Sequence, residues 1–452
     1  MEREKLGSRM GFILLSAGCA IGIGNVWRFP YITGLYGGSA FVLFYLFFLF
    51  TMGIPVMTME FAVGRASRRS IIKSFTKLEK PGAKWHLHGY LGMAGNYLLM
   101  MFYTTVAGWM LYYFYQMLTG RFTGKSPEQV GGMFQDMLSE PLVLTVSMVV
   151  VVAAGILICS MGLQKGVERI TKIMMSLLLV IIVVLAVHGL TLEGSMEGVK
   201  FYLLPDFQRM KQVGIWETVT AAMNQAFFTL SLGIGSMAIF GSYIDKKRTL
   251  LGEAVNIAVL DTFVALVSGL IIFPTCFAFG ISPDAGPQLI FVTLPNVFNS
   301  MAGGRIWGTL FFVFMTFAAF STILAVFENI ISCCMDLFHW SRKKACLVNL
   351  AALIVLSLPC VLGYNLWSAF QPLGEGSAVL DLEDFAVSNV ILPIGSLCYL
   401  LFCVTRYGWG FDHYLEETNT GTGLKMPKGL RFYLSYILPV LLVFLIVLGL
   451  AG

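Results

Sequence analysis

The chain has 452 residues, of which 57% are hydrophobic and only 12% are charged, and its mean hydropathy is +0.79. This composition excludes a soluble globular protein of this size and indicates a polytopic membrane protein. The formal net charge of +5 does not indicate a nucleic-acid partner, because no basic patch is interleaved with exposed aromatic residues.

Apolar runs of about 18 residues or more are long enough to cross a bilayer. We expect eleven such spans, centred near residues 22, 51, 102, 151, 178, 228, 264, 320, 354, 395 and 440. The sequence therefore predicts an all-α polytopic membrane protein. No linker or low-complexity segment divides it, so residues 1–452 are expected to form a single transmembrane domain.

Lys and Arg residues in the short loops predict the orientation, because cytoplasmic loops carry an excess of both. With loops numbered alternately, one side holds six basic residues, and the other side holds most of the 30, including the dense first loop from Arg65 to Lys84. We expect a cytoplasmic N-terminus and an outside C-terminus. The sequence contains no Asn-x-Ser/Thr sequon, which favours a bacterial cytoplasmic membrane.

The first span is predicted to be interrupted within the membrane. It contains the run Gly18–Pro30, in which Gly22, Gly24, Asn25 and Arg28 occur inside an apolar segment. Glycine lowers helix propensity by about 1 kcal/mol, and polar residues are costly at that depth. Close helix packing of the glycines is the alternative, but Asn25, Arg28 and Pro30 together favour a broken helix whose free backbone groups face a ligand, as in secondary transporters.

The sixth span repeats this pattern with Gly233-Ile-Gly235 at its middle, five spans after Gly22-Ile-Gly24. An odd number of spans per repeat would place the two copies in opposite orientation. We therefore expect a 5+5 inverted repeat, with repeat one at about 9–190, repeat two at about 214–406, and an extra eleventh helix at about 430–450. The outer loops at about 191–214 and 282–305 are long enough for short helices, and the second, with three prolines, suggests a re-entrant cap.

A helix broken near Gly22 exposes carbonyl groups that attract a cation and N–H groups that attract a carboxylate. Oxygen ligands for a hard monovalent cation occur in the central spans, at Asn25, Thr229, Ser231, Asp261, Ser321 and Thr322. Ser321 and Thr322 could instead bond to their own helix. A carboxylate inside the apolar run 257–273 requires a partner, and sodium is a suitable one for Asp261.

The runs Gly24-Asn-Val-Trp-Arg-Phe-Pro-Tyr31 and Phe228-Thr-Leu-Ser-Leu-Gly233, with the spacing of all eleven spans, resemble the neurotransmitter:sodium symporter family, especially its bacterial amino-acid-transporting members. The resemblance covers essentially the whole chain. It implies the fold of the bacterial leucine transporters and sodium-driven alternating access.

By position, the resemblance implies two sodium sites, a substrate site and two gates. It assigns the first sodium to Ala20, Asn25, Thr229 and Asp261, and the second to Gly18, Ile21, Ala318, Ser321 and Thr322. It assigns the substrate to Ala20, Gly22, Gly24, Leu99, Tyr103, Phe228, Ser231, Ile234 and Val326. It pairs Arg28 with Asp384 as an outer gate, and Arg3 with Asp336, near Tyr243, as an inner gate.

Three positions refine what the resemblance implies. Ile234 stands where an aromatic residue closes the pocket in the leucine transporters, so a bulkier substrate side chain should fit. Chloride-dependent relatives have a serine at the position of Ala265, near Tyr45, Gln225 and Thr229, so we expect no chloride requirement. Asp261, which replaces a neutral asparagine, would balance the sodium charge directly, or would release a proton when sodium enters.

The predicted function is a sodium-coupled symporter that imports hydrophobic zwitterionic L-amino acids. The alternatives are a sodium-dependent transporter of another small amine or amino-acid-like solute, or a non-transporting membrane sensor or channel. An enzyme is not expected, because the five histidines form no ligand cluster. Membrane lipid and a small-molecule amino acid are the expected partners, with no nucleic acid and no obligate protein partner.

Overall fold

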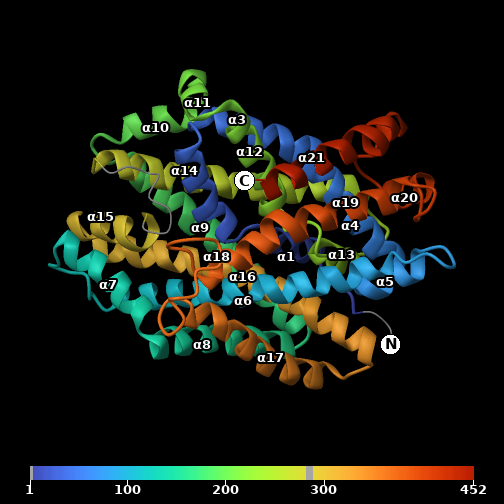
Figure 1. Ribbon diagram of the computed structural model, residues 1–452, viewed down its shortest axis with the longest axis horizontal. Helices are drawn as coiled ribbons and strands as arrows, with labels where there is room; N and C mark the ends of the chain where they lie inside the picture. The colour runs from blue at the N-terminus through green and yellow to red at the C-terminus, as the bar shows by residue number, and fades with distance from the viewer. Residues whose placement is uncertain (1–3, 281–288, 452) are drawn as a thin grey trace.

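The computed structural model describes residues 4–280 and 289–451 (Figure 1), and within these ranges the regular structure is helical, with one isolated β-bridge between Arg248 and Thr422. The long helices run side by side along the longest axis in Figure 1. In chain order, the α-helices are α1 (Arg9–Ala20), α2 (Phe29–Leu35), α3 (Ser39–Phe48), α4 (Ile54–Ser67), α5 (Ile71–Leu78), α6 (His86–Leu118), α7 (Pro127–Ser139), α8 (Pro141–Ser160), α9 (Arg169–Leu190), α10 (Ser195–Leu203), α11 (Phe207–Val213), α12 (Ile215–Thr229), α13 (Ser236–Gly241), α14 (Leu250–Ala278), α15 (Leu294–Ser300), α16 (Gly304–Phe338), α17 (Arg342–Leu362), α18 (Val379–Phe385), α19 (Leu392–Val404), α20 (Phe411–Asn419) and α21 (Leu438–Ala451).

A helix lies at each of the eleven expected positions, although not all are uniform apolar rods. In the described ranges, eight helical segments are long and apolar enough to cross a membrane, and α1 with the helix Gly24–Leu35 makes a ninth as a bent pair. The two other expected spans are α6, whose 33 residues include many polar and small ones, and the pair α12–α13, which a break divides. α6 is long enough to cross a membrane but is less apolar than the other spans. α12 and α13 are each too short to cross it alone, because the break divides this span.

The first predicted break is present between α1 and residue 24, where the helix axis bends by 55°. The N–H groups that lose their helical partners find new ones: Gly22 donates to the Asn25 side-chain oxygen at 3.3 Å, and Ile23 donates to the Tyr103 hydroxyl at 2.8 Å. Backbone groups in an apolar region require such partners. The helix resumes as a π-helical turn, Gly24–Arg28, which continues into α2.

The second break separates α12 from α13 and is built on positive φ angles at Ser231 (51°), Gly233 (97°) and Gly235 (78°). The Glu60 carboxylate of α4 accepts the N–H groups of Gly233 at 2.5 Å and Met237 at 3.2 Å. A side chain at Gly233 would collide with the Leu392 carbonyl. A buried carboxylate therefore holds the start of α13 in place.

The two ends of the bundle carry different elements. In Figure 1, α5 and α20 lie near the N-terminus at the right, whereas α7 and α15 lie at the left. The first long outer loop carries the short helices α10 and α11, as expected. The expected re-entrant cap falls partly on residues 281–288, outside the described residues; the part described is the apolar segment Leu289–Ser300.

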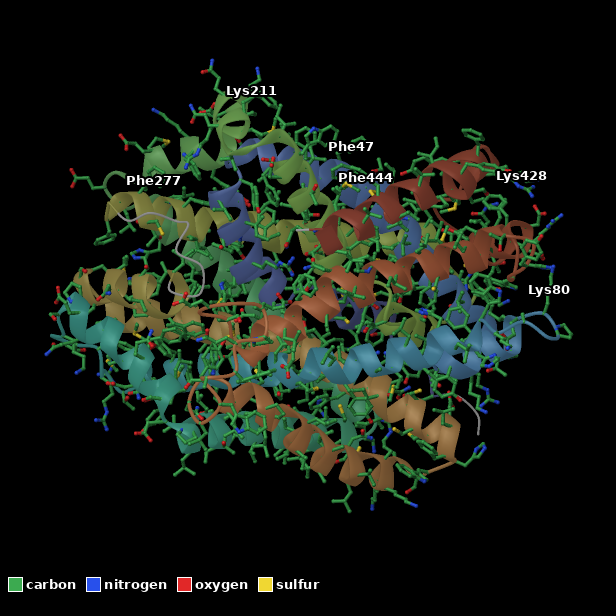
Figure 2. All side chains as sticks on the ribbon, viewed as in Figure 1. Phe47, Lys80, Lys211, Phe277, Lys428 and Phe444 are labelled. Atoms are coloured by element: carbon green, nitrogen blue, oxygen red, sulfur yellow. The ribbon has the colours of Figure 1, made fainter. Side chains whose placement is uncertain are left out.

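Figure 2 shows basic side chains such as Lys80 and Lys428 at the end that carries the N-terminus, and Phe47 and Phe444 on the flank of the bundle. Phe47 is 58% exposed and Phe444 is 40% exposed. Exposed apolar side chains along the flank, with charges at the ends, are the pattern of a surface that faces lipid.

Candidate functional site

The two breaks and the neighbouring helices α14 and α16 surround one buried polar region. Asn25, at the start of the second half of the first span, donates from its side-chain nitrogen to the Asp261 carboxylate at 2.8 Å and to the Asp261 carbonyl at 3.2 Å. Thr229, the last residue of α12, donates to the other carboxylate oxygen at 3.0 Å. Asp261 and Asn25 are fully buried. The Asp261 carboxylate and the Thr229 hydroxyl therefore meet beside the Asn25 amide, whose own oxygen accepts the Gly22 N–H at 3.3 Å. Carboxylate, hydroxyl and amide oxygens are the ligand types that a hard cation prefers.

A second oxygen cluster lies where α16 crosses the end of α1. Ser321 donates to the carbonyls of Ile21 at 3.3 Å and Ala318 at 2.9 Å. Thr322 donates to the carbonyls of Gly18 at 3.2 Å, Cys19 at 3.3 Å and Ile21 at 3.5 Å. Both hydroxyls are buried. All five residues expected at the second sodium site are thus brought together, and their carbonyl and hydroxyl oxygens fit a desolvated monovalent cation.

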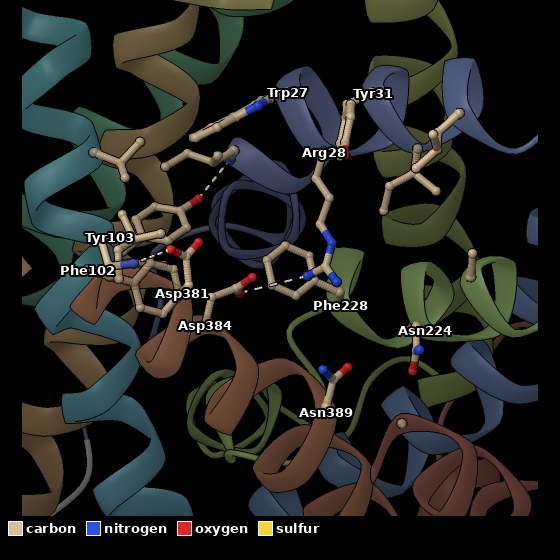
Figure 3. A pocket seen from close by; sticks show the side chains of 18 of the residues that line it. Trp27, Arg28, Tyr31, Phe102, Tyr103, Asn224, Phe228, Asp381, Asp384 and Asn389 are labelled. Carbon is tan, nitrogen blue, oxygen red and sulfur yellow. Dashed lines mark hydrogen bonds and ion pairs between the residues drawn. The ribbon is translucent and has the colours of Figure 1, made fainter. Parts of the chain in front are cut away.

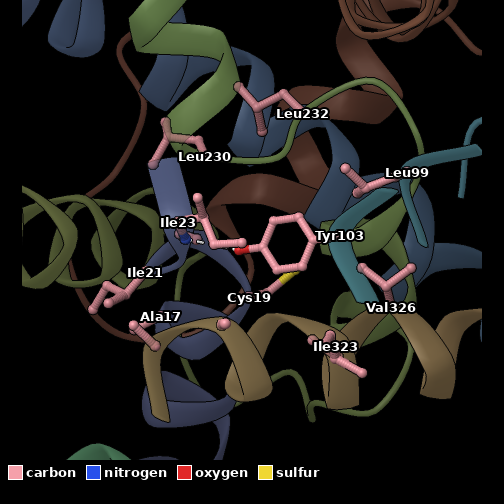
Figure 4. Packing of buried hydrophobic residues seen from close by; sticks show 14 of the residues in the cluster. Ala17, Cys19, Ile21, Ile23, Leu99, Tyr103, Leu230, Leu232, Ile323 and Val326 are labelled. Carbon is pink, nitrogen blue, oxygen red and sulfur yellow. Dashed lines mark hydrogen bonds between the residues drawn. The ribbon is translucent and has the colours of Figure 1, made fainter. Parts of the chain in front are cut away.

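Between these clusters lies a small enclosed cavity of about 10 Å³, room for about one water molecule. Figure 4 shows Tyr103 pointing toward Ile23 across this region, with Leu99 and Val326 on the far side of the ring. The residues that line the cavity are Cys19, Ala20, Gly22, Gly24, Leu99, Tyr103, Phe228, Ser231, Thr322 and Leu392. They include seven of the nine substrate residues expected from the sequence.

The glycines of the first break allow this close approach. A side chain on Gly22 would collide with the Tyr103 hydroxyl and with Thr322, and one on Gly24 would meet the Phe228 ring at 2.8 Å. The main chain itself therefore forms one wall of the cavity. The Gly22 and Ile23 N–H groups of this wall bond to Asn25 and Tyr103 here, and a carboxylate could bind them by replacing one of these acceptors.

Two expected pocket residues, Ile234 and Val326, are fully buried but lie outside the set that lines the cavity. Cys19, Thr322 and Leu392 line it and were not predicted as pocket residues. Leu392 could not be predicted from the sequence, because an apolar residue in an apolar span is indistinguishable from a packing residue. Cys19 could have been found, since it lies within the predicted break.

A much larger cavity, of about 1110 Å³, lies beyond Phe228 and Tyr103, which line both spaces. Figure 3 shows Arg28 reaching over Phe228 toward Asp384. The guanidinium lies 4.2 Å from the ring centroid, 3.9 Å from the Asp384 carboxylate and 3.1 Å from the Ser388 hydroxyl, which donates to Asp384 at 2.7 Å. The expected pair Arg28 and Asp384 is thus brought together in the large cavity, over the Phe228 ring, and its role as an outer gate stays a prediction.

A buried ion pair lies at the opposite end of the bundle. Arg342 contacts Glu328 at 2.7 and 3.0 Å, and Tyr243 donates to the same carboxylate at 2.7 Å. The inner gate expected from the sequence involved Arg3, which lies outside the described residues. Asp336, the described member of that pair, accepts the Ser70 N–H at 2.7 Å and lies 3.9 Å from the Arg69 guanidinium, so the loop between α4 and α5 supplies a basic partner to it.

A small cavity between two interrupted membrane helices, with buried oxygen clusters beside it and a larger cavity beyond it, is the arrangement found in secondary transporters. Comparison with known proteins identifies the family. The model of the sodium:neurotransmitter symporter family matches residues 3–130 and 129–451, so the chain belongs to that family. It is a sodium-dependent membrane transporter and not an enzyme, and the family, the all-helical fold and the use of sodium predicted from the sequence are confirmed.

Relatives extend over nearly the whole chain. A sodium-dependent transporter of Bacillus subtilis (strain 168), YhdH, is 35% identical over 87% of this chain and 86% of its own length. A sodium-dependent transporter of Methanocaldococcus jannaschii, MJ1319, is 31% identical over 98% of this chain and 89% of its own length. The crystal structure of MhsT in complex with L-phenylalanine matches with a TM-score of 0.89 and 38% identity, covering 98% of this chain and 99% of that one.

Proposed function

We propose that the protein is a symporter that imports hydrophobic zwitterionic L-amino acids together with sodium by alternating access. The observation that most supports this proposal is the enclosed cavity between the two breaks. Main-chain groups of Gly22 and Gly24 and the Tyr103 hydroxyl lie on one wall, and the apolar side chains Leu99 and Phe228 lie on others. The chemistry of this lining, rather than its volume of about 10 Å³ in this state, suits a carboxylate at the main-chain wall and an uncharged side chain beyond it.

Two features support an amino acid over a bare amine. No Asp or Glu lies among the residues that line the small cavity, so the substrate ammonium would rely on main-chain carbonyls and the substrate carboxylate. A side chain at Gly22 is excluded by Tyr103 and Thr322, so an acid cannot be accommodated there in this arrangement. The similar MhsT structure holds L-phenylalanine.

We propose that two sodium ions are carried with each substrate. The first would bind among Ala20, Asn25, Thr229 and Asp261 and be completed by the substrate carboxylate; the second would bind among Gly18, Ile21, Ala318, Ser321 and Thr322. Support comes from the two separate oxygen clusters. Since Asp261 supplies a fixed carboxylate and Ala265 offers no hydroxyl, transport should proceed without chloride.

In the proposed cycle, the N-terminus lies in the cytoplasm and the large cavity opens to the outside. The cavity beyond Phe228 and the closed inner end support an arrangement in which substrate arrives from outside. Arg28 and Asp384 would close over the substrate, and separation of the Arg342, Glu328 and Tyr243 contacts would then open the inner side. Each side would thus open only after the other has closed.

The test is binding of a panel of the twenty amino acids and several amines to the purified protein, in sodium and in choline. L-phenylalanine and phenethylamine form a matched pair that differs by the carboxylate. We expect sodium-dependent binding of the apolar amino acids and much weaker binding of phenethylamine. Equal affinity for the two compounds, or equal binding in choline, would contradict the proposal.

A further inference from the structure

Leu392 is the first residue of α19 and follows the π-helical turn Ala386–Ile391. Its side chain is 2% exposed, and it lines the small cavity together with residues of both breaks and of α6. We propose that Leu392 is a specificity-determining residue whose side chain limits the size of the substrate side chain. This inference rests on the proposed function and adds a wall from α19, the tenth expected span, to the substrate site.

Backbone contacts hold Leu392 in place. A Cβ on Gly233 would collide with the Leu392 carbonyl, and a Cβ on Gly395 would collide with the Gly233 carbonyl. The start of α19 therefore lies main chain against main chain on the break between α12 and α13. Neither segment has room to approach further, and Glu60 accepts the Gly233 N–H. We therefore expect a smaller side chain at 392 to enlarge the cavity and a larger one to fill it.

Ile234, expected to close the pocket, is directed elsewhere. A Cβ on Gly95 would lie 2.9 Å from Ile234 Cγ2 and 2.7 Å from Ile391 Cγ2. The Ile234 carbonyl accepts the side-chain N–H of Asn96 at 2.8 Å. The Ile234 side chain therefore packs between α6, at Gly95, and Ile391. Gly95 lies one helical turn before Leu99, the α6 residue that lines the cavity. We therefore infer that Leu392, and not Ile234, closes the side-chain end of the substrate pocket.

The other residues that line the cavity are less able to select substrates by the size of their side chains. The Tyr103 hydroxyl is held by the Ile23 N–H, the first-break wall is main chain, and Phe228 lies beneath the Arg28 guanidinium. Leu392 and Leu99 are the remaining large apolar side chains among the residues that line the cavity. One methylene group in a pocket of this kind changes selectivity by about 10- to 200-fold, so a Leu-to-Ala change at 392 should be readily measured.

The experiment uses the full-length protein in lipid nanodiscs at saturating sodium. L-tryptophan and L-valine each compete with labelled L-leucine for binding, and the readout is the ratio of their inhibition constants. Leu392→Ala should shift this ratio at least about tenfold in favour of tryptophan, and Leu392→Phe should shift it toward valine. Leu400→Ala is the matched control, because Leu400 is fully buried on the same helix, two turns further on, and outside the cavity wall; it should leave the ratio unchanged.

Ile234→Ala distinguishes the two candidates for the closing wall and should shift the ratio less than Leu392→Ala. A larger shift from Ile234→Ala, or an unchanged ratio in both folded Leu392 variants while the wild type binds apolar amino acids, would overturn the inference. A wild-type protein that binds no apolar amino acid would overturn the proposed function and this inference with it. Leu392→Phe provides the answer if Leu392→Ala does not fold.

Discussion

At the scale of single residues, the buried oxygens around the breaks are the groups most directly tied to function. Asn25 and Thr322 each belong to one of the two oxygen clusters. Replacing Asn25 by Ala should weaken sodium binding at the first cluster, and replacing Thr322 by Ala should weaken it at the second. Loss of one ligand in a desolvated site should cost about 1–3 kcal/mol, which a sodium titration of substrate binding would measure.

Thr316→Ala is the control for Thr322, since the Thr316 hydroxyl lies on the same helix and donates to the Phe312 carbonyl of its own helix at 2.7 Å. Its sodium titration should match the wild type. If the Asn25 and Thr322 variants also titrate like the wild type, the assignment of the two clusters to sodium is wrong.

Asp261 supports a second prediction at this scale, concerning chloride. Its carboxylate is bonded by Asn25 and Thr229 and would balance the charge of a sodium ion at any chloride concentration. Replacing chloride by gluconate at constant sodium should leave wild-type uptake unchanged. Asp261→Asn should weaken sodium affinity or make uptake sensitive to chloride. Loss of wild-type uptake in gluconate would show that an anion is required after all.

At the scale of elements, the break between α12 and α13 depends on Glu60. Glu60→Gln replaces a carboxylate that accepts two N–H groups with an amide that has a single oxygen, so the N–H of either Gly233 or Met237 loses its acceptor. A buried donor left without an acceptor costs about 1–3 kcal/mol. We expect a lower melting temperature and weaker substrate binding. Thr58→Ala, which removes a hydroxyl bonded within α4, should not weaken binding. Wild-type melting and binding in Glu60→Gln would refute this role for Glu60.

The inner closure supports an element-scale prediction about conformational populations. Tyr243→Phe removes the hydroxyl that donates to the buried Glu328 carboxylate at 2.7 Å, a charge-assisted bond of about 1.5–3 kcal/mol. The variant should populate inward-open states more, as measured by labelling of a cysteine introduced on the inner side of α1. Tyr97→Phe, which loses a bond to Asn349 between α6 and α17, is the comparison. Equal labelling of Tyr243→Phe and wild type would contradict a locking role.

The sequence predicted elements best where the chemistry is unusual for a membrane. The glycine pairs at 22–24 and 233–235 identified both breaks, because interrupted helices need residues that ordinary spans avoid. The sequence did not identify the partners that stabilise them, such as Glu60, since these come from distant spans. It placed Ile234 in the cavity wall, which Leu392 lines instead. The sequence does not show the close approach of α19 to the second break, which brings Leu392 there, because the two segments are far apart in the chain. The boundaries of the two repeats remain predictions.

At the scale of the whole molecule, the proposed cycle moves two positive charges with each zwitterion. Each elementary charge that crosses about 100 mV gains about 2.3 kcal/mol, so two gain about 4.6 kcal/mol. This corresponds to a substrate gradient on the order of a thousandfold. The apolar flanks and charged ends of the bundle agree with a protein that spans the membrane in which that potential acts.

The most direct test of the central claim is uptake of labelled L-phenylalanine into proteoliposomes that contain the purified protein. The account predicts accumulation against a concentration gradient when sodium is higher outside, with a further increase when the interior is made negative. It predicts no accumulation when choline replaces sodium. Uptake that is the same in choline as in sodium, or that never exceeds equilibration, would contradict a sodium-coupled amino-acid symporter.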